Sequence, residues 1–337
     1  MNYYVKIYSV KPKEDINRFV ESIGYVPVMP DIKRRGGIAH FLIKTLTLFF
    51  ILKRLHKGDL LLIQYPYKKF YTLTCNVAHW KGAKVITLIH DLGSFRRKKL
   101  TPAKENWMLM HTDYLICHNE AMLDFLVEQG FTKFIDTLQI FDYLAASPIP
   151  RSKERHTPWQ VTFAGGLGYG RSPFIYHLDD SIKTWELQLY GKHFDQQRAQ
   201  GWKHIHYNGL FTPEQLINEV EGDFGLVWDG DSLDQCSGNW GEYLLINNPH
   251  KASFTLRMGL PVIIWSKAAL APFILEHGVG LCIDSLRDLN DVLDNLSEEE
   301  YNKMRHNAEL MSEKIGTGYF THRAMREAEK CLLGNEK

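Results

Sequence analysis

A glycine-rich segment in the middle of the chain is suited to holding an anion. Residues 159–164 (WQVTFA) have the pattern of a buried strand, and residues 165–172 (GGLGYGRS) follow directly. Glycines after a strand let backbone N–H groups approach a phosphate or a sugar ring closely. The guanidinium of Arg171 adds a fork of donors that matches a diphosphate. We therefore predict that Gly166 and Arg171 contact an anionic ligand. The spacing is neither GxGxxG nor a Walker A motif, which disfavours dehydrogenases and P-loop enzymes.

A second segment joins aromatic residues to the start of a helix. Residues 206–211 (HYNGLF) read as a strand end and a glycine turn. Thr212 then serves as the N-cap of a helix whose first residue is a proline. Tyr207 or Phe211 would lie where a ring can stack on a nucleobase. The alternative, which the sequence leaves open, is that both rings belong to the core.

The third segment, residues 243–253 (YLLINNPHKAS), is the most specific of the three. Asn247 and Asn248 precede a predicted helix, and Lys251 falls in its first turn. A cation at this end opposes the helix dipole, so Lys251 favours a bound anion there. We predict a diphosphate site formed by these three residues and Ser253.

Short apolar runs along the whole chain indicate the strands that position these segments. Runs such as LLLIQY (60–65) and VITLIH (85–90) are apolar without alternation, which is typical of parallel strands buried on both faces. Helix-like stretches separate the runs, as βαβ units require. The proline-containing segment 145–158 reads as a linker. We predict an N-terminal domain over 1–150, a C-terminal domain over 151–318, and a final helix over 319–337 that packs back on the first domain.

The stretch 38–52 (IAHFLIKTLTLFFIL) has two interpretations. It is apolar on nearly every side and is shorter than the roughly 20 residues that span a bilayer. One interpretation is a helix buried between a sheet and a domain interface. The other is an apolar surface that rests on a membrane, aided by cations at 33–35 and 96–99.

Composition and charge limit the class of protein. Of 337 residues, 45% are apolar and 23% charged, which is ordinary for a globular protein. The five scattered cysteines and the lack of a secretory leader favour a cytoplasmic location. Residues 1–150 contain 21 Lys and Arg against 13 Asp and Glu, whereas the remainder has the opposite balance. One interpretation is that the basic half contacts anionic lipid or a phosphate-bearing acceptor. The other is that its charges are ordinary solvated surface.

The order of the three segments resembles that of GT-B glycosyltransferases. Residues 247–253 (NNPHKAS), with 223–232 (DFGLVWDGDS) before them, are similar to the bacterial family of β-1,6-galactofuranosyltransferases and adhesin glucosyltransferases. Residues 89–96 resemble that family's IHDL-x-x-x-R segment. The resemblance implies two Rossmann-like domains facing across a cleft and a UDP-sugar donor contacted by Arg171, Tyr207 and Lys251. It also implies chemistry without a metal or other cofactor, a saccharide acceptor linked to lipid or protein, self-association, and no nucleic-acid partner.

An inverting transfer needs a base that takes the proton of the acceptor hydroxyl. Our candidate is Asp91, which follows the strand 84–90 at the edge where parallel sheets place ligands. A cap of the next helix is the alternative role for Asp91, and His90 and the pair Asp229 and Asp231 are rival bases. Asp229-Gly230-Asp231 has the DxD form, but we expect it to shape a loop. Gly36 and Gly37 are predicted to approach the donor from the first domain.

Two other functions fit the same pattern. A UDP-sugar epimerase of the UDP-N-acetylglucosamine 2-epimerase kind shares the two-domain architecture and would turn over its substrate without an acceptor. A non-catalytic subunit that binds a nucleotide sugar for a partner transferase would bind UDP without turnover.

Overall fold

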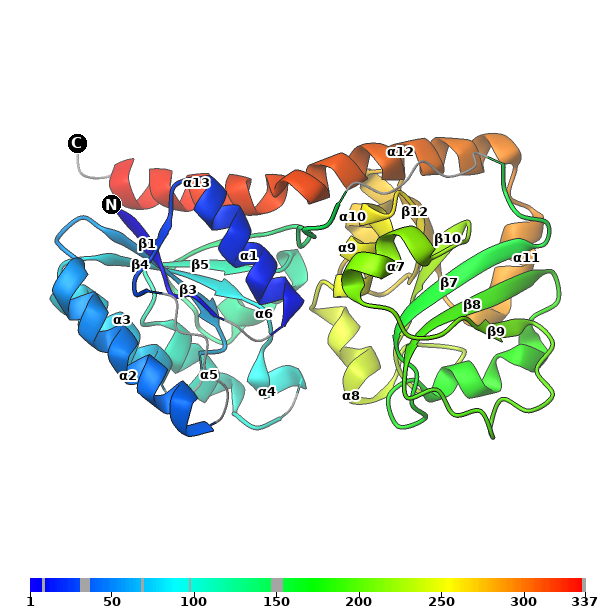
Figure 1. Ribbon diagram of the computed structural model, residues 1–337, viewed down its shortest axis with the longest axis horizontal. Helices are drawn as coiled ribbons and strands as arrows, with labels where there is room; N and C mark the ends of the chain where they lie inside the picture. Colours follow the sequence, from blue (N-terminus) through cyan, green and yellow to red (C-terminus); the bar gives the residue numbers. More distant parts are fainter. Residues whose placement is uncertain (8–9, 31–36, 68–69, 97, 147–153, 335–337) are drawn as a thin grey trace. The chain divides into compact units, whose positions relative to one another are not determined.

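The computed structural model describes residues 1–7, 10–30, 37–67, 70–96, 98–146 and 154–334. The chain forms two compact units. Unit 1 comprises Met1–Leu138 with Gly318–Lys337, and unit 2 comprises Gln139–Thr317. Each unit is a parallel sheet with helices around it (Figure 1). The predicted α/β class with two parallel sheets is confirmed.

The sheet of unit 1 has the strand order β2-β1-β3-β4-β5-β6, and all its pairs are parallel. The central strands β3 and β4 are buried almost throughout, because each is a continuous apolar run covered on both faces. The strands are β1 (Asn2–Tyr4), β2 (Val26–Pro27), β3 (Leu60–Tyr65), β4 (Lys84–Ile89), β5 (Tyr114–Cys117) and β6 (Phe134–Thr137). The helices are α1 (Lys11–Ser22), α2 (Gly37–Arg54), α3 (Tyr71–Trp80), α4 (Gly93–Arg96), α5 (Pro102–Leu109), α6 (Glu120–Glu128) and α13 (Tyr319–Leu333).

The sheet of unit 2 has the order β12-β11-β10-β7-β8-β9 and is also parallel. The chain runs outward from β7 to β9 and then returns to the other side of β7 at β10. The carboxyl ends of β7 and β10 therefore flank the topological switch point, where open parallel sheets bind ligands. The strands are β7 (Trp159–Gly166), β8 (Trp185–Lys192), β9 (Ile205–Tyr207), β10 (Phe224–Val227), β11 (Val262–Trp265) and β12 (Gly280–Ile283). The α-helices are α7 (Pro213–Glu219), α8 (Gly238–Gly241), α9 (His250–Arg257), α10 (Ala271–Glu276), α11 (Leu289–Asp294) and α12 (Glu298–Thr317).

Unit 2 begins at Gln139, earlier than the boundary at 150 drawn from the proline-containing segment. The rings of Phe141 and Tyr143 lie 5.1 Å and 5.8 Å from that of His250, the first residue of α9. The side-chain amide of Asn248 donates to the carbonyl of Gln139 at 2.9 Å. These contacts attach the segment to unit 2 before the prolines are reached.

The C-terminal helix α13 belongs to unit 1, where it packs on α1 and β5. It is separated from α12 by Gly318, whose φ of 81° lies in the left-handed region that favours glycine. A Cβ on Gly318 would also lie 2.4 Å from the ring of Phe19. Near the C-terminal end of α13, the carboxylate of Glu329 accepts a hydrogen bond of 3.0 Å from the side-chain amide of Asn2 in β1.

Helix α2 is not buried all round. Thr47 and Ile51 are buried, as is Leu55 just after the helix, but Phe41 and Phe49 are more than half exposed. The interpretation of residues 38–52 as a buried helix is therefore wrong for the face that carries Phe41 and Phe49, because α3 and the other elements that α2 contacts cover only part of its circumference. None of the helices in the described part of the chain combines the length and apolar character needed to cross a bilayer.

Candidate functional site

Two cations and one carboxylate meet at the switch point of unit 2. The ammonium of Lys251 lies 3.0 Å from Oδ1 of Asp229 and donates to the carbonyl of Trp228 at 3.1 Å. The Nη2 atom of Arg171 lies 3.2 Å from the same carboxylate oxygen. Arg171 follows β7, Asp229 follows β10, and Lys251 is the second residue of α9. Three segments that are far apart in sequence thus converge at one edge of the sheet.

Glycines and aromatic rings make room for the two cations and hold them. A Cβ on Gly165 would lie 3.5 Å from Cε of Lys251, and one on Gly166 would lie 3.3 Å from Cγ of Arg171. The ammonium of Lys251 lies 4.3 Å from the ring centre of Phe163. The guanidinium of Arg171 lies 3.5 Å from that of Trp240. Cation–π contacts of this kind stabilise the positions of both groups.

The charges of this cluster favour an anion. The pKa of Lys251 is lowered overall, mainly because the ammonium is buried and also because the positive charge of Arg171 is near. The carboxylate of Asp229 acts in the opposite direction and raises this pKa. The side chain of Lys251 is 18% exposed and that of Arg171 is 33% exposed, so solvent and ligands reach both. The two cations share the carboxylate of Asp229. The N-cap of α9 is Pro249, which makes no side-chain hydrogen bond to the helix, so the positive end of the helix dipole also favours an anion here.

The other residues predicted around Lys251 occupy different environments. Asn248 is nearly buried, and its amide nitrogen is engaged with the carbonyl of Gln139. Ser253 is fully buried within α9. Among the described residues, no hydrogen-bond partner reaches the buried Oδ1 of Asn247. Contacts of these three residues with an anion stay predictions, and Lys251 is the member of the group that lies in the cation cluster.

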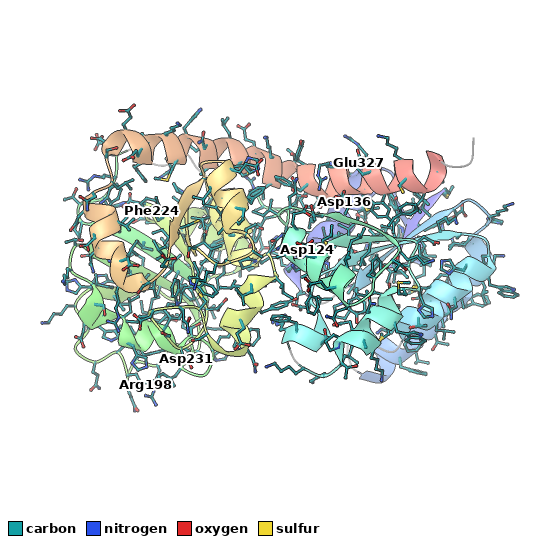
Figure 2. The ribbon with its side chains drawn as sticks, turned by 180° about the vertical axis from the view of Figure 1, so that it is seen from behind. Asp124, Asp136, Arg198, Phe224, Asp231 and Glu327 are labelled. Atoms are coloured by element: carbon teal, nitrogen blue, oxygen red, sulfur yellow. The ribbon has the colours of Figure 1, made fainter. Side chains whose placement is uncertain are left out.

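The segment after β10 is a tight loop. Gly230 has a φ of 115°, and a Cβ there would lie 2.4 Å from the carbonyl oxygen of Ser237. Asp231, labelled in Figure 2, accepts a hydrogen bond from the hydroxyl of Ser237. Within the described residues, no three His, Cys, Asp or Glu side chains gather in a way that could hold a metal ion. The loop sets Asp229 between the two cations and leaves Asp231 on the surface.

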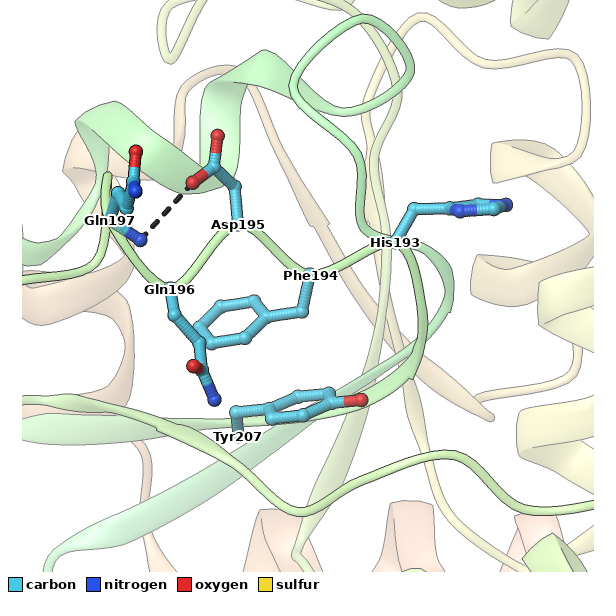
Figure 3. Close-up of a pocket in the computed structure, with 6 residues that line it drawn as sticks. All are labelled: His193, Phe194, Asp195, Gln196, Gln197 and Tyr207. Carbon is cyan, nitrogen blue, oxygen red and sulfur yellow. Dashed lines mark hydrogen bonds between the residues drawn. The ribbon is translucent and has the colours of Figure 1, made fainter.

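Tyr207 lines an open hollow of about 660 Å³ with residues 193–197 (Figure 3). Its ring stacks on that of Phe194 with the centres 4.3 Å apart, and its hydroxyl donates to the carbonyl of Gly191 at 3.0 Å. Phe211 lies outside this stack, with its ring centre 6.2 Å from that of Tyr190. Tyr207 is 38% exposed and therefore has ring surface available to a ligand.

The hollow and the cation cluster belong to one edge of one sheet. Phe163 of β7 is in register with Leu189 of β8, which is in register with Tyr207 of β9. The backbones of Tyr207 and Phe163, whose ring contacts the ammonium of Lys251, are therefore two strand spacings apart, or about 9.6 Å. A ligand with an aromatic base at one end and phosphates at the other would fit along this edge.

Asp91 lies in unit 1, just after β4, and forms an ion pair with Arg96. The neighbouring His90 shares a hydrogen bond of 2.7 Å with Gln64. The buried carboxylate of Glu105 accepts from the backbone N–H groups of Gly93 and Ser94, each at 2.8 Å, and so fixes the loop that presents Asp91.

The two predicted glycines of unit 1 are less informative. Gly37 is the first residue of α2, and Gly36 lies outside the described residues. Their predicted approach to the donor stays a prediction.

Three residues of the site have roles that were not predicted from the sequence. Asp229 was expected to shape a loop or to act as the base, whereas it lies between Lys251 and Arg171. Phe163 and Trp240, whose rings contact the two cations, were not singled out. The signal for Asp229 was its place directly after an apolar run, at the ligand-binding edge of a parallel sheet.

Two units with parallel sheets, and an anion-attracting cluster at the switch point of the second, match the architecture of GT-B glycosyltransferases. Residues 8–140 match the family model described as "Glucosyltransferase 3-like, N-terminal domain". Residues 161–328 match "Glucosyltransferase 3-like, C-terminal domain". The chain belongs to this Glucosyltransferase 3-like family of glycosyltransferases.

Two curated relatives support this assignment, and one solved structure shares the fold. Beta-1,6-galactofuranosyltransferase WbbI of Escherichia coli (strain K12) is 31% identical over 87% of this chain and 86% of its own length. Glucosyltransferase 3 of Streptococcus gordonii is 27% identical over 74% of this chain and 72% of its own. The lipopolysaccharide outer core galactosyltransferase WaaB has a TM-score of 0.59 at 12% identity, covering 97% of this chain and 100% of that one. This last likeness concerns the fold alone.

Proposed function

We propose that the protein transfers a hexosyl unit from a UDP-sugar to a saccharide acceptor in the synthesis of a bacterial surface polysaccharide or glycoprotein. The observation that supports this most directly is the pair of cations around Asp229 at the switch point of unit 2. A pyrophosphate there would contact Lys251 and Arg171, and the uracil would reach the ring of Tyr207 along the same sheet edge. Galactofuranose is the candidate sugar because the relative at 31% identity transfers it, and glucose is the other candidate.

The proposed reaction is an inverting displacement. The acceptor hydroxyl oxygen forms a bond to the anomeric carbon while the bond from that carbon to the UDP oxygen breaks. Asp91 takes the proton of the acceptor hydroxyl, and negative charge grows on the leaving UDP. Lys251, Arg171 and the amino end of α9 are fixed donors that would neutralise this charge, so the proposed mechanism needs no metal or other cofactor. Self-association and a cytoplasmic location stay predictions of the sequence.

A screen of nucleotide sugars tests the proposed function. We expect UDP-galactofuranose, UDP-glucose or UDP-galactose to raise the melting temperature, because a ligand that binds only the folded state stabilises it by about 2.7 kcal/mol at a hundred times its Kd. GDP- and dTDP-glucose at the same concentration serve as the controls.

Product analysis with and without a saccharide acceptor then separates the three functions. The proposal requires sugar transfer and UDP release only when acceptor is present. Conversion of the UDP-sugar without acceptor would instead establish an epimerase. Binding without turnover under either condition would favour a non-catalytic subunit.

Substitution of Asp229 tests whether its carboxylate balances the two cations. We expect Asp229→Asn to lower stability without ligand by about 1 kcal/mol, or roughly 2–4 °C in melting temperature, because Lys251 and Arg171 lose the carboxylate that both contact. UDP would restore the balance, so its stabilising shift should be larger in this variant than in the wild type. Thermal unfolding with and without UDP measures both effects.

Asp231→Asn is the matched control, since Asp231 lies two residues away on the surface and pairs only with Ser237 among the described contacts. Equal melting temperatures and equal UDP shifts in the two variants would contradict the assigned role of Asp229.

A further inference from the structure

Helix α2 of unit 1 presents an apolar face to solvent. Phe41, Leu42, Leu46 and Phe49 are 59%, 50%, 41% and 57% exposed. Leu42, Leu46 and Phe49 follow the spacing i, i+4, i+7, which aligns them along one side of a helix. Isolated exposed apolar residues are common on proteins, but a continuous stripe of large ones indicates an interaction surface.

Helix α3 extends this face. The ring of Phe41 lies 5.5 Å from that of Phe70, which immediately precedes α3. Leu73 and Trp80 lie three and ten residues further on, so they fall on the same side of α3 as Phe70. Leu73 is 48% exposed and Trp80 is 79% exposed. We call this set the α2–α3 apolar surface, and its members are Phe41, Leu42, Leu46, Phe49, Phe70, Leu73 and Trp80.

The segment that carries the surface is basic, and the one carboxylate described next to α3 from elsewhere, Asp113, is paired with His79. Helices α2 and α3 contain no acidic residue, and the sequence from 37 to 90 has only one, Asp59. Asp59 is nearly buried, and its carboxylate accepts a hydrogen bond from the backbone of His56. The same stretch holds eight Lys and Arg. Of these, Lys53 and Lys57 are exposed at the end of α2, next to the apolar stripe.

We infer that the α2–α3 apolar surface docks on an anionic lipid bilayer, with α2 lying in the plane of the interface. An apolar face bordered by cations, with a tryptophan at its margin, matches the chemistry of such an interface. Anionic headgroups attract basic segments at short range. Because no described helix can cross a bilayer, the contact would be peripheral. The inference goes beyond the proposed transfer reaction and does not depend on it.

A second copy of the chain fits this surface less well. A two-fold contact places the same patch of each copy against the other, so the cations of one would face those of its partner. Like charges brought together in this way oppose association. An anionic bilayer instead neutralises the same cations. The charge pattern therefore favours lipid.

Flotation of the full chain with vesicles tests the inference. We expect binding to vesicles of equal parts phosphatidylglycerol and phosphatidylcholine, little binding to phosphatidylcholine alone, and weaker binding as salt is raised. The variant Leu46→Gln/Phe49→Gln should bind the anionic vesicles at least tenfold more weakly. Both side chains are exposed, so the fold should be preserved, and circular dichroism verifies this.

The matched control is Leu275→Gln/Leu310→Gln, which changes two exposed leucines of unit 2. It should bind vesicles as the wild type does. The inference is overturned if the wild type does not float with anionic vesicles, or if the two double variants bind equally. It is also overturned if the α2 variant changes the molecular mass in light scattering while vesicle binding is unchanged, which would assign the surface to a second copy. Turnover of a water-soluble acceptor should be unaffected by either variant.

Discussion

Replacement of Lys251 by alanine is expected to weaken UDP binding by about 10- to 150-fold, measured by calorimetry. The estimate follows from the loss of one hydrogen bond to a charged group, about 1.5–3 kcal/mol, at 1.4 kcal/mol for each factor of ten. The fold should persist, because Asp229 keeps Arg171 as its partner. Alanine is also favourable in the first turn of α9, where a cation opposes the helix dipole.

Lys303→Ala provides the control, since Lys303 is an exposed lysine on α12. It should bind UDP as the wild type does. Unchanged UDP affinity in Lys251→Ala, with a melting temperature close to that of the control, would remove Lys251 from the site and with it the main support for the proposed function.

Replacement of Asp91 by asparagine is expected to reduce turnover by about 10²- to 10⁴-fold, the usual contribution of a general base. UDP affinity should be unaffected, because Asp91 belongs to unit 1 and the UDP contacts proposed above belong to unit 2. Steady-state rates with saturating donor and acceptor measure the first effect, and calorimetry with UDP measures the second.

The ion pair with Arg96 offers a second role for Asp91, and two variants separate the roles. If Asp91 served only to hold Arg96, then Arg96→Gln would reduce turnover as much as Asp91→Asn. If Asp91 is the base, Asp91→Asn should reduce turnover more than Arg96→Gln does. Asp124→Asn changes an exposed residue of α6 (labelled in Figure 2) and controls for a change of charge in the same unit. Wild-type turnover in Asp91→Asn would require another base.

The fold was largely predictable because buried parallel strands leave a strong local signal. The run LLLIQY became β3 and the run VITLIH supplied most of β4, and both strands are buried almost throughout. Residues whose role depends only on neighbours within one helical turn were also predictable. An example is Thr212, whose hydroxyl caps α7 by accepting a hydrogen bond from the backbone N–H of Gln215. Lys251 was found for the same reason, since its conflict with the dipole of α9 is a local property.

Contacts between distant segments were not predictable. Asp229 and Lys251 are 22 residues apart and Arg171 lies further away still, so their meeting depends on β7 and β10 being neighbours in the sheet. The stacking of Tyr207 on Phe194 likewise depends on how the chain turns between β8 and β9. A single sequence contains the residues of such clusters, but their pairing is fixed only by strand order and register.

The sequence by itself determined the α/β class, the two-sheet pattern and the segments that hold Lys251, Arg171 and Asp91. Only the tertiary structure decided which carboxylate joins the two cations, where unit 2 begins, and which face of α2 meets solvent. Periodicity and capping depend on residues within a few positions of one another, so a sequence displays them directly. Charge balance and exposure depend on which distant segments come together, and that is settled only when the sheets assemble.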